Sequence, residues 1–385
     1  MRESLKGKHI VLGVTGSIAA VETVRLAHAL QRKGAVVTAV MSNAATGIIH
    51  PDALTYATGN NTIVDITGRV EHITYCGDCG LADLFLIAPC TANTLCKVAA
   101  GIDDTPVTTF ATTAIGRDMP IIIVPAMHHS MFRHPAVRDS LTRLESWGVM
   151  VVPPRIEEGK AKIAEIDEIV LFCERELLGK PLAGKKVLIT SGPCQEEIDD
   201  VRIMTTRSSG RMGQELALQA FRLGAEVIIV HHAYLSCMRN IVVTSAADMR
   251  AEVIRICTQE KPDLYISAAA ISDFAPKKFE GKLRSGGVRK ITLLPLPKLL
   301  DEVINEYGIP CIAFKLGKDA EEPARELLGK GAVIVVINGP ETMGSAEGEI
   351  LILNQHSRVN LSGTKEDLAV TLWDRILGDS GAFGW

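Results

Sequence analysis

Two stretches of this chain share one layout, and the repetition limits the possible folds more than any other feature. Residues 187–190 are an aliphatic run that breaks into Ser191-Gly192-Pro193, and the loop after it ends in Ser208-Ser209-Gly210 before a helical pattern. Near the N-terminus, residues 8–14 run into Gly16-Ser17 in the same way. A buried strand, a glycine turn and a helix start are how a nucleotide-binding α/β unit opens. One opening lies at the start and the other near the middle of 385 residues, so we predict two tandem α/β domains.

The charge balance excludes some classes of partner. The chain has 41 basic and 45 acidic side chains, a formal net charge of -4, and no basic block. Nucleic acid and anionic membranes are therefore poor candidates, and small metabolites are better ones. No charged and apolar leader is present, and apolar runs such as 120–125 are far shorter than the roughly 20 residues that cross a bilayer. We expect a cytoplasmic protein.

Nine cysteines are scattered over both halves, often inside apolar runs. An odd, dispersed set favours reduced thiols over a disulfide framework. Cys76 and Cys79 have the spacing of a metal or redox pair, but no second pair follows at zinc-site distance. A metal site and surface or active-site thiols both remain open for this pair, with thiols favoured.

In the first half, the runs 10–14, 36–41, 84–88 and 121–124 read as buried parallel strands. Polar residues follow the first three, and the carboxyl ends of parallel strands meet at one crevice. The Gly16-Ser17 turn could hold a phosphate at a helix N-terminus, or it could simply need glycine for tight packing. The crevice is expected to contain Ser17, Ser42, Thr91, Asn93 and Thr94.

Four segments in order make the first half specific: Gly16-Ser-Ile-Ala19, His72-Ile73, Ala88 to Thr94, and Pro125-Ala-Met127 with Met131. They resemble the flavin-binding cysteine decarboxylases, in particular phosphopantothenoylcysteine decarboxylases, over residues 8–155. The resemblance implies a flavodoxin-like, Rossmann-like domain with FMN in the crevice and His72 as the catalytic base, whereas His72 read alone would more often be a surface histidine. The implied FMN contacts are Gly16, Ser17, Ile18, Ser42, Thr91, Asn93 and Thr94.

The first half departs from that family at three places, one of which is a longer spacing from His72 to Asp83 that carries Cys76 and Cys79. His128 stands where asparagine usually holds the substrate carboxylate, and we expect the imidazole to take over this task. The usual flap cysteine, which returns a proton at the end of the reaction, is missing between Val152 and Leu178, and the segment there resembles archaeal members. The candidates for that proton are Lys160, Lys162, Cys76 and Cys79.

The boundary between the halves is expected near residue 182. Residues 164–178 have the pattern of a closing helix, and Gly179 to Gly184 is a short link with glycine and proline. We therefore assign residues 1–180 to the FMN-binding domain and residues 184–385 to the second domain.

The second half carries another ordered set of segments. They are Thr190-Ser-Gly-Pro193, Asp199-Asp-Val-Arg202, Ser208 to Gly213, Ala269 to Pro276, Gly281-Lys282, Pro297-Lys298, Ala313-Phe314-Lys315 and Val335 to Asn338. This set resembles phosphopantothenate–cysteine ligases. The resemblance implies a second Rossmann-like domain that activates a carboxylate with CTP in the presence of Mg2+, releases pyrophosphate and transfers the acyl group to the cysteine amine.

Roles for single residues follow from that resemblance. Lys282 is expected to bind the triphosphate as a catalytic residue, although a lone loop lysine is more often solvated. Thr206 stands where the family has asparagine, so we expect it at the catalytic centre with a changed hydrogen-bonding capacity. The expected binding residues for substrate and nucleotide are Arg202, Ser208, Ser209, Gly210, Asp273, Phe314 and Asn338, with Asp273 also a Mg2+ ligand.

The whole chain is thus expected to be a bifunctional enzyme of coenzyme A biosynthesis that assembles as a homo-oligomer, with trimeric flavin domains and dimeric ligase domains. An alternative is a flavin-binding regulatory protein with a decayed decarboxylase site. A nicotinamide oxidoreductase is excluded because neither opening contains G-x-G-x-x-G.

Overall fold

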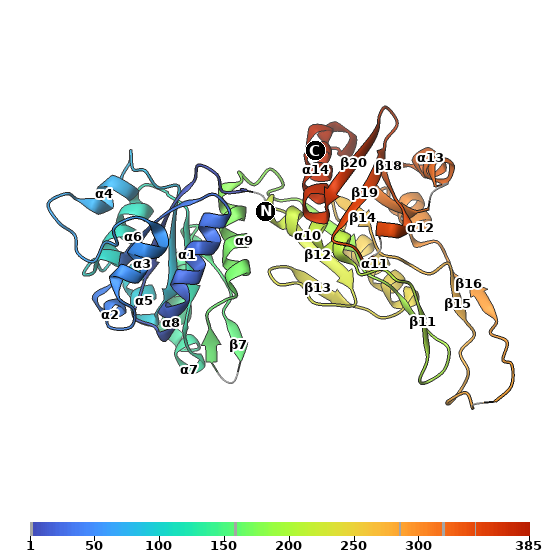
Figure 1. The fold of residues 1–385 in the computed structure, drawn as a ribbon, viewed down its shortest axis with the longest axis horizontal. Helices are drawn as coiled ribbons and strands as arrows, with labels where there is room; N and C mark the ends of the chain where they lie inside the picture. The colour runs from blue at the N-terminus through green and yellow to red at the C-terminus, as the bar shows by residue number, and fades with distance from the viewer. Residues whose placement is uncertain (1–2, 158–159, 285, 318–319, 343) are drawn as a thin grey trace. The chain divides into compact units, whose positions relative to one another are not determined.

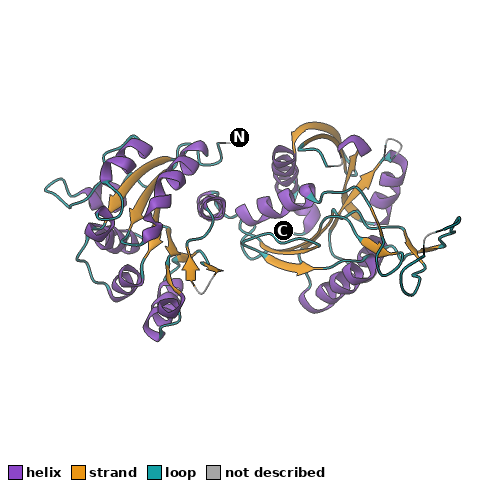
Figure 2. Ribbon diagram, turned by 60° about the horizontal axis from the view of Figure 1, so that its bottom comes forward, coloured by secondary structure: helices purple, strands orange, loops and turns teal. Residues whose placement is uncertain are grey.

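The computed structural model describes residues 3–157, 160–284, 286–317, 320–342 and 344–385 (Figure 1). The chain divides into two compact units, Met1–Gly179 and Lys180–Trp385. Each unit is an open α/β sheet with helices on both faces, so the predicted fold class is confirmed (Figure 2).

The first unit is built on a five-stranded parallel sheet in the order β2-β1-β3-β4-β6. Its main strands are almost entirely buried, which explains why each reads as a continuous aliphatic run. The strands are β1 (His9–Val14), β2 (Val36–Met41), β3 (Leu84–Cys90), β4 (Ile121–Pro125) and β6 (Met150–Val151). A second, antiparallel sheet joins β5 (Met127–His128), β8 (Lys160–Lys162) and β7 (Arg155–Glu157).

Helices cover both faces of the first sheet. Buried side chains of α4, α5, α6 and α8 pack on one face, and α1 and α9 pack on the other. The bounds are α1 (Thr23–Arg32), α2 (Asn43–Thr46), α3 (Pro51–Thr58), α4 (Glu71–Cys76), α5 (Ala92–Ala100), α6 (Pro106–Gly116), α7 (His129–Phe132), α8 (Pro135–Ser146) and α9 (Ile166–Leu177).

The helix after Gly16 differs from its sequence pattern. Ile18 and Val21 recur with Val24 and Ala27 at helical spacing, which predicts one buried face. Instead, residues Ile18–Glu22 form the 3-10 turn η1, with Ile18 78% and Val21 50% exposed. The turn follows the carboxyl end of β1, and Ala20 is its only buried residue, whereas several residues of α1 pack into the core.

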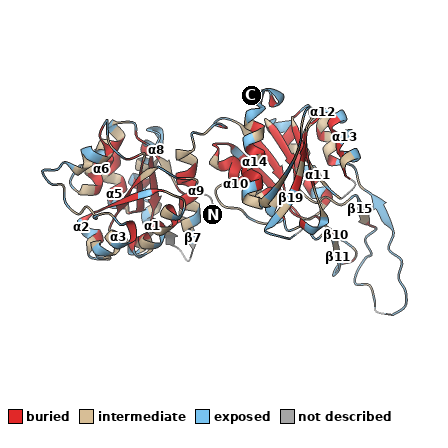
Figure 3. Ribbon diagram, turned by 45° about the horizontal axis from the view of Figure 1, so that its top comes forward, coloured by how far each residue is buried: buried red, intermediate tan, exposed pale blue. Residues whose placement is uncertain are grey.

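The second unit is built on an eight-stranded sheet in the order β13-β12-β9-β14-β17-β18-β19-β20. Strands β13 to β18 in this order are parallel, and the last two form an antiparallel edge. Figure 3 shows buried residues along its central strands. The bounds are β9 (Lys186–Thr190), β12 (Glu226–His231), β13 (Arg239–Val242), β14 (Leu264–Ser267), β17 (Cys311–Leu316), β18 (Ala332–Asn338), β19 (Glu347–Leu353) and β20 (Arg358–Thr364).

Helices α11, α12 and α13 pack on one face of this sheet, and α10 and α14 pack together on the other. The fully buried Trp373 of α14 donates its indole N–H to the carbonyl of Leu216 in α10 at 3.0 Å. The bounds are α10 (Arg211–Arg222), α11 (Ala246–Glu260), α12 (Leu299–Tyr307), α13 (Glu321–Lys330) and α14 (Lys365–Gly378), with the short turns η2 (Pro340–Thr342) and η3 (Ser380–Phe383).

Two hairpin-like arms extend from the second unit (Figure 1). One pairs β10 (Gln195–Glu197) with β11 (Ile203–Thr205), and the other pairs β15 (Phe274–Pro276) with β16 (Leu293–Pro295). The buried carboxylate of Asp199 joins them, because it accepts N–H bonds from Val201 at 2.8 Å, Arg202 at 2.6 Å and Leu283 at 3.0 Å.

All nine cysteines are free. Cys76, Cys90, Cys173, Cys194, Cys257 and Cys311 are buried, and burial raises the pKa of each of these thiols. Cys79 is exposed, and Cys96 and Cys237 are half-buried. Within the described part of the chain, no helix is long and apolar enough to cross a membrane.

Candidate functional site

Three helix starts meet the carboxyl edge of the first sheet. Ser17 after β1, Ser42 after β2 and Thr91 after β3 are the N-caps of η1, α2 and α5. Ser17 accepts the N–H of Ala19 at 3.4 Å, and Thr91 accepts that of Thr94 at 3.3 Å. Helix starts carry free N–H groups and a positive dipole end, so this edge suits an anionic ligand.

The turns around this edge are held close together. Thr15 donates its hydroxyl to the carbonyl of Pro89 at 2.7 Å, and its oxygen accepts the N–H of Thr91 at 3.0 Å. A Cβ on Gly16 would lie 2.6 Å from the Cβ of Ala44, so only glycine allows the first two turns to approach.

The side chains that are expected to contact FMN differ in how deeply they are buried. The Ser42 hydroxyl is buried and has no hydrogen-bond partner among the described residues. Thr94 is buried, Ser17 and Thr91 are half-buried, and Asn93 and Ile18 are exposed. The edge therefore combines backbone donors, an unpaired hydroxyl and an exposed apolar side chain.

His72 lies in the first turn of α4, which begins after Val70 in a left-handed conformation with φ 46°. The side chain is half-buried, and its Nδ1 is buried without a hydrogen-bond partner in the described structure. A histidine with a free ring nitrogen of this kind can accept a proton. Cys76 ends the same helix, and burial raises the pKa of its thiol to about 12.

His128 is exposed at the end of β5, where it caps α7. Its Nδ1 lies 2.8 Å from the hydroxyl of Ser130 and accepts the N–H of that residue at 3.3 Å. Its strand pairs with β8, and His128 lies opposite Lys160 in the register. The segment that replaces the usual flap thus meets the strand of His128. The side chain of Lys160 lies outside the described residues.

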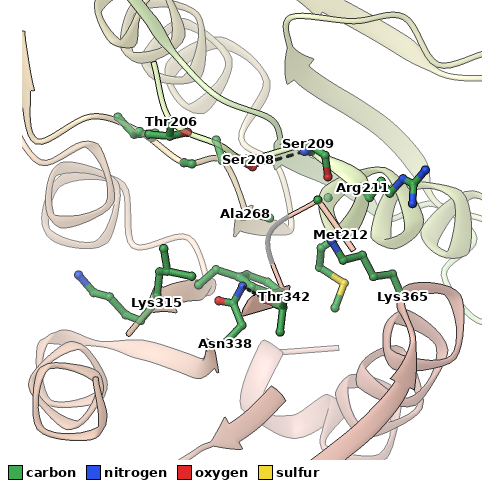
Figure 4. Close-up of a pocket in the computed structure, with 18 of the residues that line it drawn as sticks. Thr206, Ser208, Ser209, Arg211, Met212, Ala268, Lys315, Asn338, Thr342 and Lys365 are labelled. Atoms are coloured by element: carbon green, nitrogen blue, oxygen red, sulfur yellow. Dashed lines mark hydrogen bonds between the residues drawn. The ribbon is translucent and has the colours of Figure 1, made fainter. Parts of the chain in front are cut away.

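In the second unit, a pocket of about 380 Å³ opens at the carboxyl ends of β14, β17 and β18, beside the N-terminus of α10 (Figure 4). It is lined by seven residues expected from the sequence: Thr206, Ser208, Ser209, Gly210, Asp273, Phe314 and Asn338. The pocket also contains Arg211, Lys315, Thr342 and Lys365.

The wall at α10 depends on glycine. Gly210 has φ 73°, and a Cβ there would lie 3.0 Å from the Cα of Gly192. A Cβ on Gly213 would lie 2.5 Å from the hydroxyl oxygen of Ser191, which itself donates to the carbonyl of Gly210 at 2.8 Å. The first turn of α10 therefore packs directly on the end of β9, at the wall of the pocket.

A second hollow of about 210 Å³ continues from the first. The two share Ala269, Ile271, Asp273, Phe314 and Lys315. The second hollow adds Lys298 and Lys330, and Lys330 pairs with Asp301 at 2.7 Å. Together they form a cleft with cations at both ends and in the middle.

Lys282 and Arg202 are not brought into this cleft. Lys282 is exposed on the arm that contains β15 and β16. Arg202 pairs with Asp199 and donates to the carbonyl of Leu283 at 3.4 Å. Lys282 was expected at the triphosphate and Arg202 at the substrate or nucleotide, but in the described structure both lie on arms that extend away from the pocket wall.

Comparison with known proteins agrees with this geometry. The Flavoprotein family matches residues 1–178, and the DNA/pantothenate metabolism flavoprotein C-terminal domain family matches residues 182–379. The coenzyme A biosynthesis bifunctional protein CoaBC of Thermococcus kodakarensis is 43% identical and covers 97% of this chain and 95% of its own length. The chain belongs to the CoaBC family.

Another CoaBC protein, from Methanocaldococcus jannaschii, is 34% identical over 97% of this chain and 94% of its own length. The expected archaeal-like form is thereby confirmed. Among solved structures, the C-terminal domain of a CoaBC protein covers 53% of this chain and 99% of its own, with 30% identity and a TM-score of 0.45. The FMN-dependent cysteine decarboxylase SpaF covers 43% and 97%, with 25% identity and a TM-score of 0.38.

Two residues that line the pocket, Lys365 and Arg211, were not predicted from the sequence. Arg211 follows the recognised Ser208-Ser209-Gly210 turn directly, so its place could have been predicted from that turn. Lys365 had no such signal, because it begins α14 about 150 residues later, after an antiparallel hairpin.

Proposed function

We propose that this protein catalyses two consecutive steps of coenzyme A biosynthesis. The second unit joins 4'-phosphopantothenate to cysteine, and the first decarboxylates the resulting 4'-phosphopantothenoylcysteine to 4'-phosphopantetheine. The observation that carries the proposal is the convergence of seven expected ligase residues on one pocket, in a chain related to CoaBC proteins over nearly its whole length.

The proposed ligation uses CTP to activate the pantothenate carboxylate as an acyl-cytidylate, with release of pyrophosphate. Two anions must approach each other for this step, so the cleft has to supply positive charge and N–H donors. Lys315 in the shared middle of the cleft and the α10 turn supply both. Asn338 and Asp273 offer hydrogen-bonding groups for the nucleotide.

The lining residues fit Mg2+ as the family implies. Mg2+ is usually held by one or two carboxylates together with substrate phosphates and water. Asp273 lines both hollows, while the described residues contain no cluster of three acidic, histidine or cysteine side chains that could hold a metal alone. We therefore propose Asp273 as the protein ligand to a nucleotide-bound Mg2+.

Thr206 is proposed to contact the activated acid. Its hydroxyl oxygen is buried and has no hydrogen-bond partner among the described residues, although the residue lines the pocket. Such an oxygen gains a partner when a ligand donor enters. Thr206 offers one hydroxyl where an amide would offer a donor and an acceptor, so we expect weaker orientation of the intermediate.

The first unit fits FMN. The unpaired Ser42 hydroxyl, the glycine-dependent approach at Gly16 and three adjacent helix starts suit its phosphate, and the exposed Ile18 offers apolar contact. Bound FMN would accept a hydride equivalent from the cysteine part of the substrate. We propose that His72 takes up the proton of this step at a ring nitrogen and that His128 holds the substrate carboxylate.

Four residues are candidate donors of the proton that ends the decarboxylation reaction, and one of them is a poor donor. The Cys76 thiol is buried with a pKa of about 12, which makes it a slow proton donor. Cys79 and Lys162 remain candidates, together with Lys160 on the strand opposite His128.

We also propose a cytoplasmic homo-oligomer, with trimeric flavin units and dimeric ligase units. Exposed apolar side chains on the arms, including Ile203, Phe274, Leu293 and Leu294, support an association of the second units. Light scattering of the purified protein measures the assembly, and a monomer at micromolar concentration would contradict it.

The test of the proposed function uses the purified full chain. We expect a yellow protein that releases FMN on denaturation and forms pyrophosphate from CTP only when 4'-phosphopantothenate and cysteine are both present. Mass spectrometry should then show 4'-phosphopantetheine. Ligation with bound FMN but no decarboxylation would instead support the regulatory alternative for the first unit, and no pyrophosphate release with either CTP or ATP would refute the ligase assignment.

A further inference from the structure

A pair of cysteines lies next to His72, at the end of its helix and in the loop that follows. Cys76 is the last residue of α4, and Cys79 comes three positions later. His72 lies four positions before Cys76 in the same helix, which is about one helical turn. A change in the position of Cys76 therefore reaches His72 through one short element.

The loop after α4 turns back onto the helix. Gly80 donates its N–H to the carbonyl of Gly77 at 2.7 Å, and Ala82 donates to the carbonyl of Tyr75 at 2.9 Å. One cysteine directly precedes this turn, and the other lies within it. Because the chain reverses over so few residues, a small rearrangement brings their Cα atoms to the roughly 4.4–6.8 Å that a disulfide spans.

Two glycines allow the loop to pack this closely. A Cβ on Gly77 would lie 2.7 Å from the carbonyl oxygen of Ile73, and a Cβ on Gly80 would lie 2.3 Å from that of Tyr75. A side chain at either position would collide with the backbone of α4 and push the loop away. Cys79 lies between these glycines, so it is held close to the end of the helix.

The two thiols differ in exposure. Cys79 is exposed, whereas Cys76 is fully buried. Burial raises the pKa of the Cys76 thiol to about 12, and the positive charge of Arg117 acts in the opposite direction. Arg117 also donates to the carbonyl of Gly80 at 3.3 Å, so this cation is held at the loop, where it favours the reactive thiolate. Such a pair combines a thiol that reacts first with a thiol that reacts once the end of the helix moves.

The spacing of the pair also suits a metal site, but further ligands are missing. Among the described residues, no group of three or more histidine, cysteine or carboxylate side chains could hold a metal ion. Two thiolates alone leave two positions of a tetrahedral zinc site without a protein ligand. Thiol–disulfide chemistry is therefore the better use of this pair.

We propose that Cys76 and Cys79 form a reversible disulfide that slows decarboxylation by displacing His72. This inference rests on the proposed function of the first unit. The oxidant is a low-molecular-weight disulfide. The Cys79 thiolate attacks one of its sulfur atoms, which forms a mixed disulfide and releases one small thiol. The Cys76 thiolate then attacks the sulfur of Cys79 and releases the second. Two electrons pass to the small disulfide, and the two protons of the protein thiols end on the released thiols.

The disulfide affects His72 because Cys76 is part of the core. Cys76 belongs to the same buried cluster as Phe110 and Ala114 of α6. Its sulfur has to leave this cluster to meet the exposed Cys79, so the last turn of α4 loses packing against α6. A shift of about 1 Å in a catalytic group costs on the order of 10²-fold in rate, so we expect decarboxylation to fall about 10- to 100-fold.

The test treats the purified full chain, loaded with FMN, with glutathione disulfide. After the remaining free thiols are alkylated, cleavage before each aspartate gives peptide 65–77 with Cys76 and peptide 78–82 with Cys79. Only a disulfide keeps these two peptides joined in mass spectrometry. We expect joined peptides, a 10- to 100-fold slower release of carbon dioxide from 4'-phosphopantothenoylcysteine, unchanged pyrophosphate release by the second unit, and recovery of decarboxylation with dithiothreitol.

Variants are compared by the ratio of their oxidised to their reduced rates, because Cys79 is also a candidate proton donor. Cys79→Ser and Cys76→Ala should each give a ratio near that of an untreated sample, whatever their basal rates. The matched control is the double variant Cys96→Ser/Cys237→Ser, which removes the two half-buried thiols and should respond to oxidation as the wild type does. Thermal melting identifies a misfolded Cys76→Ala variant, in which case Cys79→Ser carries the comparison.

Free thiols at both positions after oxidation, or glutathione on Cys79 without joined peptides, would overturn the inference alone. So would joined peptides in a protein that releases carbon dioxide at the reduced rate. A reduced protein that contains FMN and releases no carbon dioxide would refute the decarboxylase function itself, and the peptide map would separate that result from a failure of the cysteines to pair.

Discussion

His72 presents a ring nitrogen that the described fold leaves without a partner. We predict that His72→Asn lowers the decarboxylation rate by about 10²- to 10⁴-fold, since a positioned base contributes that much. FMN content and ligase activity should not change, because the substitution leaves the helix starts of the first sheet and the second unit intact. Carbon dioxide release from 4'-phosphopantothenoylcysteine is the measurement.

His50→Asn is the matched control for His72. His50 is an exposed N-cap of α3 in the same unit, and asparagine caps a helix equally well. Decarboxylation at the wild-type rate by His72→Asn would remove this histidine from the proposed mechanism.

The positions of some site residues could be predicted from the sequence, and those of others could not. Ser208, Asp273 and Asn338 each follow a strand of one parallel sheet or open a helix, so their convergence follows from the strand pattern. Lys365 could not be found in this way, because its place depends on how β19, β20 and α14 pack against α10. Lys282 was predicted to bind the triphosphate but lies on an arm outside the pocket, and the conformation of that arm depends on contacts outside the sheet.

The turn between β1 and η1 depends on one glycine. We predict that Gly16→Ala lowers FMN affinity and destabilises the first unit by about 1–3 kcal/mol, because the new Cβ would lie 2.6 Å from that of Ala44. Flavin absorbance after purification and thermal melting measure the two effects.

Gly47→Ala is the control for this turn. Gly47 has φ -76°, and a Cβ there would lie 3.8 Å from the carbonyl oxygen of Ala44, an ordinary contact. Equal FMN content in the Gly16→Ala variant and the wild type would show that the approach of the two turns is not needed for binding.

Asp199 connects the two arms of the second unit. Burial alone would raise the pKa of its carboxyl group, but N–H bonds from Leu283, Val201 and Arg202, with the Arg202 guanidinium, hold it well below the usual value. The carboxylate therefore stabilises the arms above its unfolded pKa of about 3.9, and this contribution is lost as the pH falls through the lower folded value.

We predict that Asp199→Asn lowers the melting temperature of the second unit at pH 7, because the amide cannot accept all these bonds. The difference from the wild type should shrink below about pH 4, because the carboxyl group of Asp199 in the unfolded wild-type chain takes up a proton there. Melting curves from pH 7 to pH 3 test this, with Asp374→Asn, an exposed position on α14 of the same unit, as control. A difference that stays constant down to pH 3 would contradict the assignment.

The strands of both units could be read from the sequence because a strand buried on both faces is a continuous aliphatic run. The prediction of a buried helix face at Ile18 was wrong, because apolar residues at this spacing occur both on buried helices and at an exposed edge where a ligand binds. The strands of the arms could not be predicted from apolar runs, since they are short and partly exposed.

At the scale of the whole molecule, each unit has its own sheet and core. We predict two calorimetric transitions for the intact chain. A ligand at 100 times its dissociation constant adds about 2.7 kcal/mol, so FMN should raise one transition and CTP the other, each by about 5–10 °C. One transition that both ligands shift would show that the units unfold together.

The buried thiols are divided evenly between the units, with Cys76, Cys90 and Cys173 in the first and Cys194, Cys257 and Cys311 in the second. A buried thiol with a raised pKa reacts only after its surroundings open. In the folded protein, a thiol reagent should therefore modify the exposed Cys79 first. Modification of the three buried cysteines of a unit then reports that this unit has opened, so thiol labelling can follow the unfolding of the two units separately.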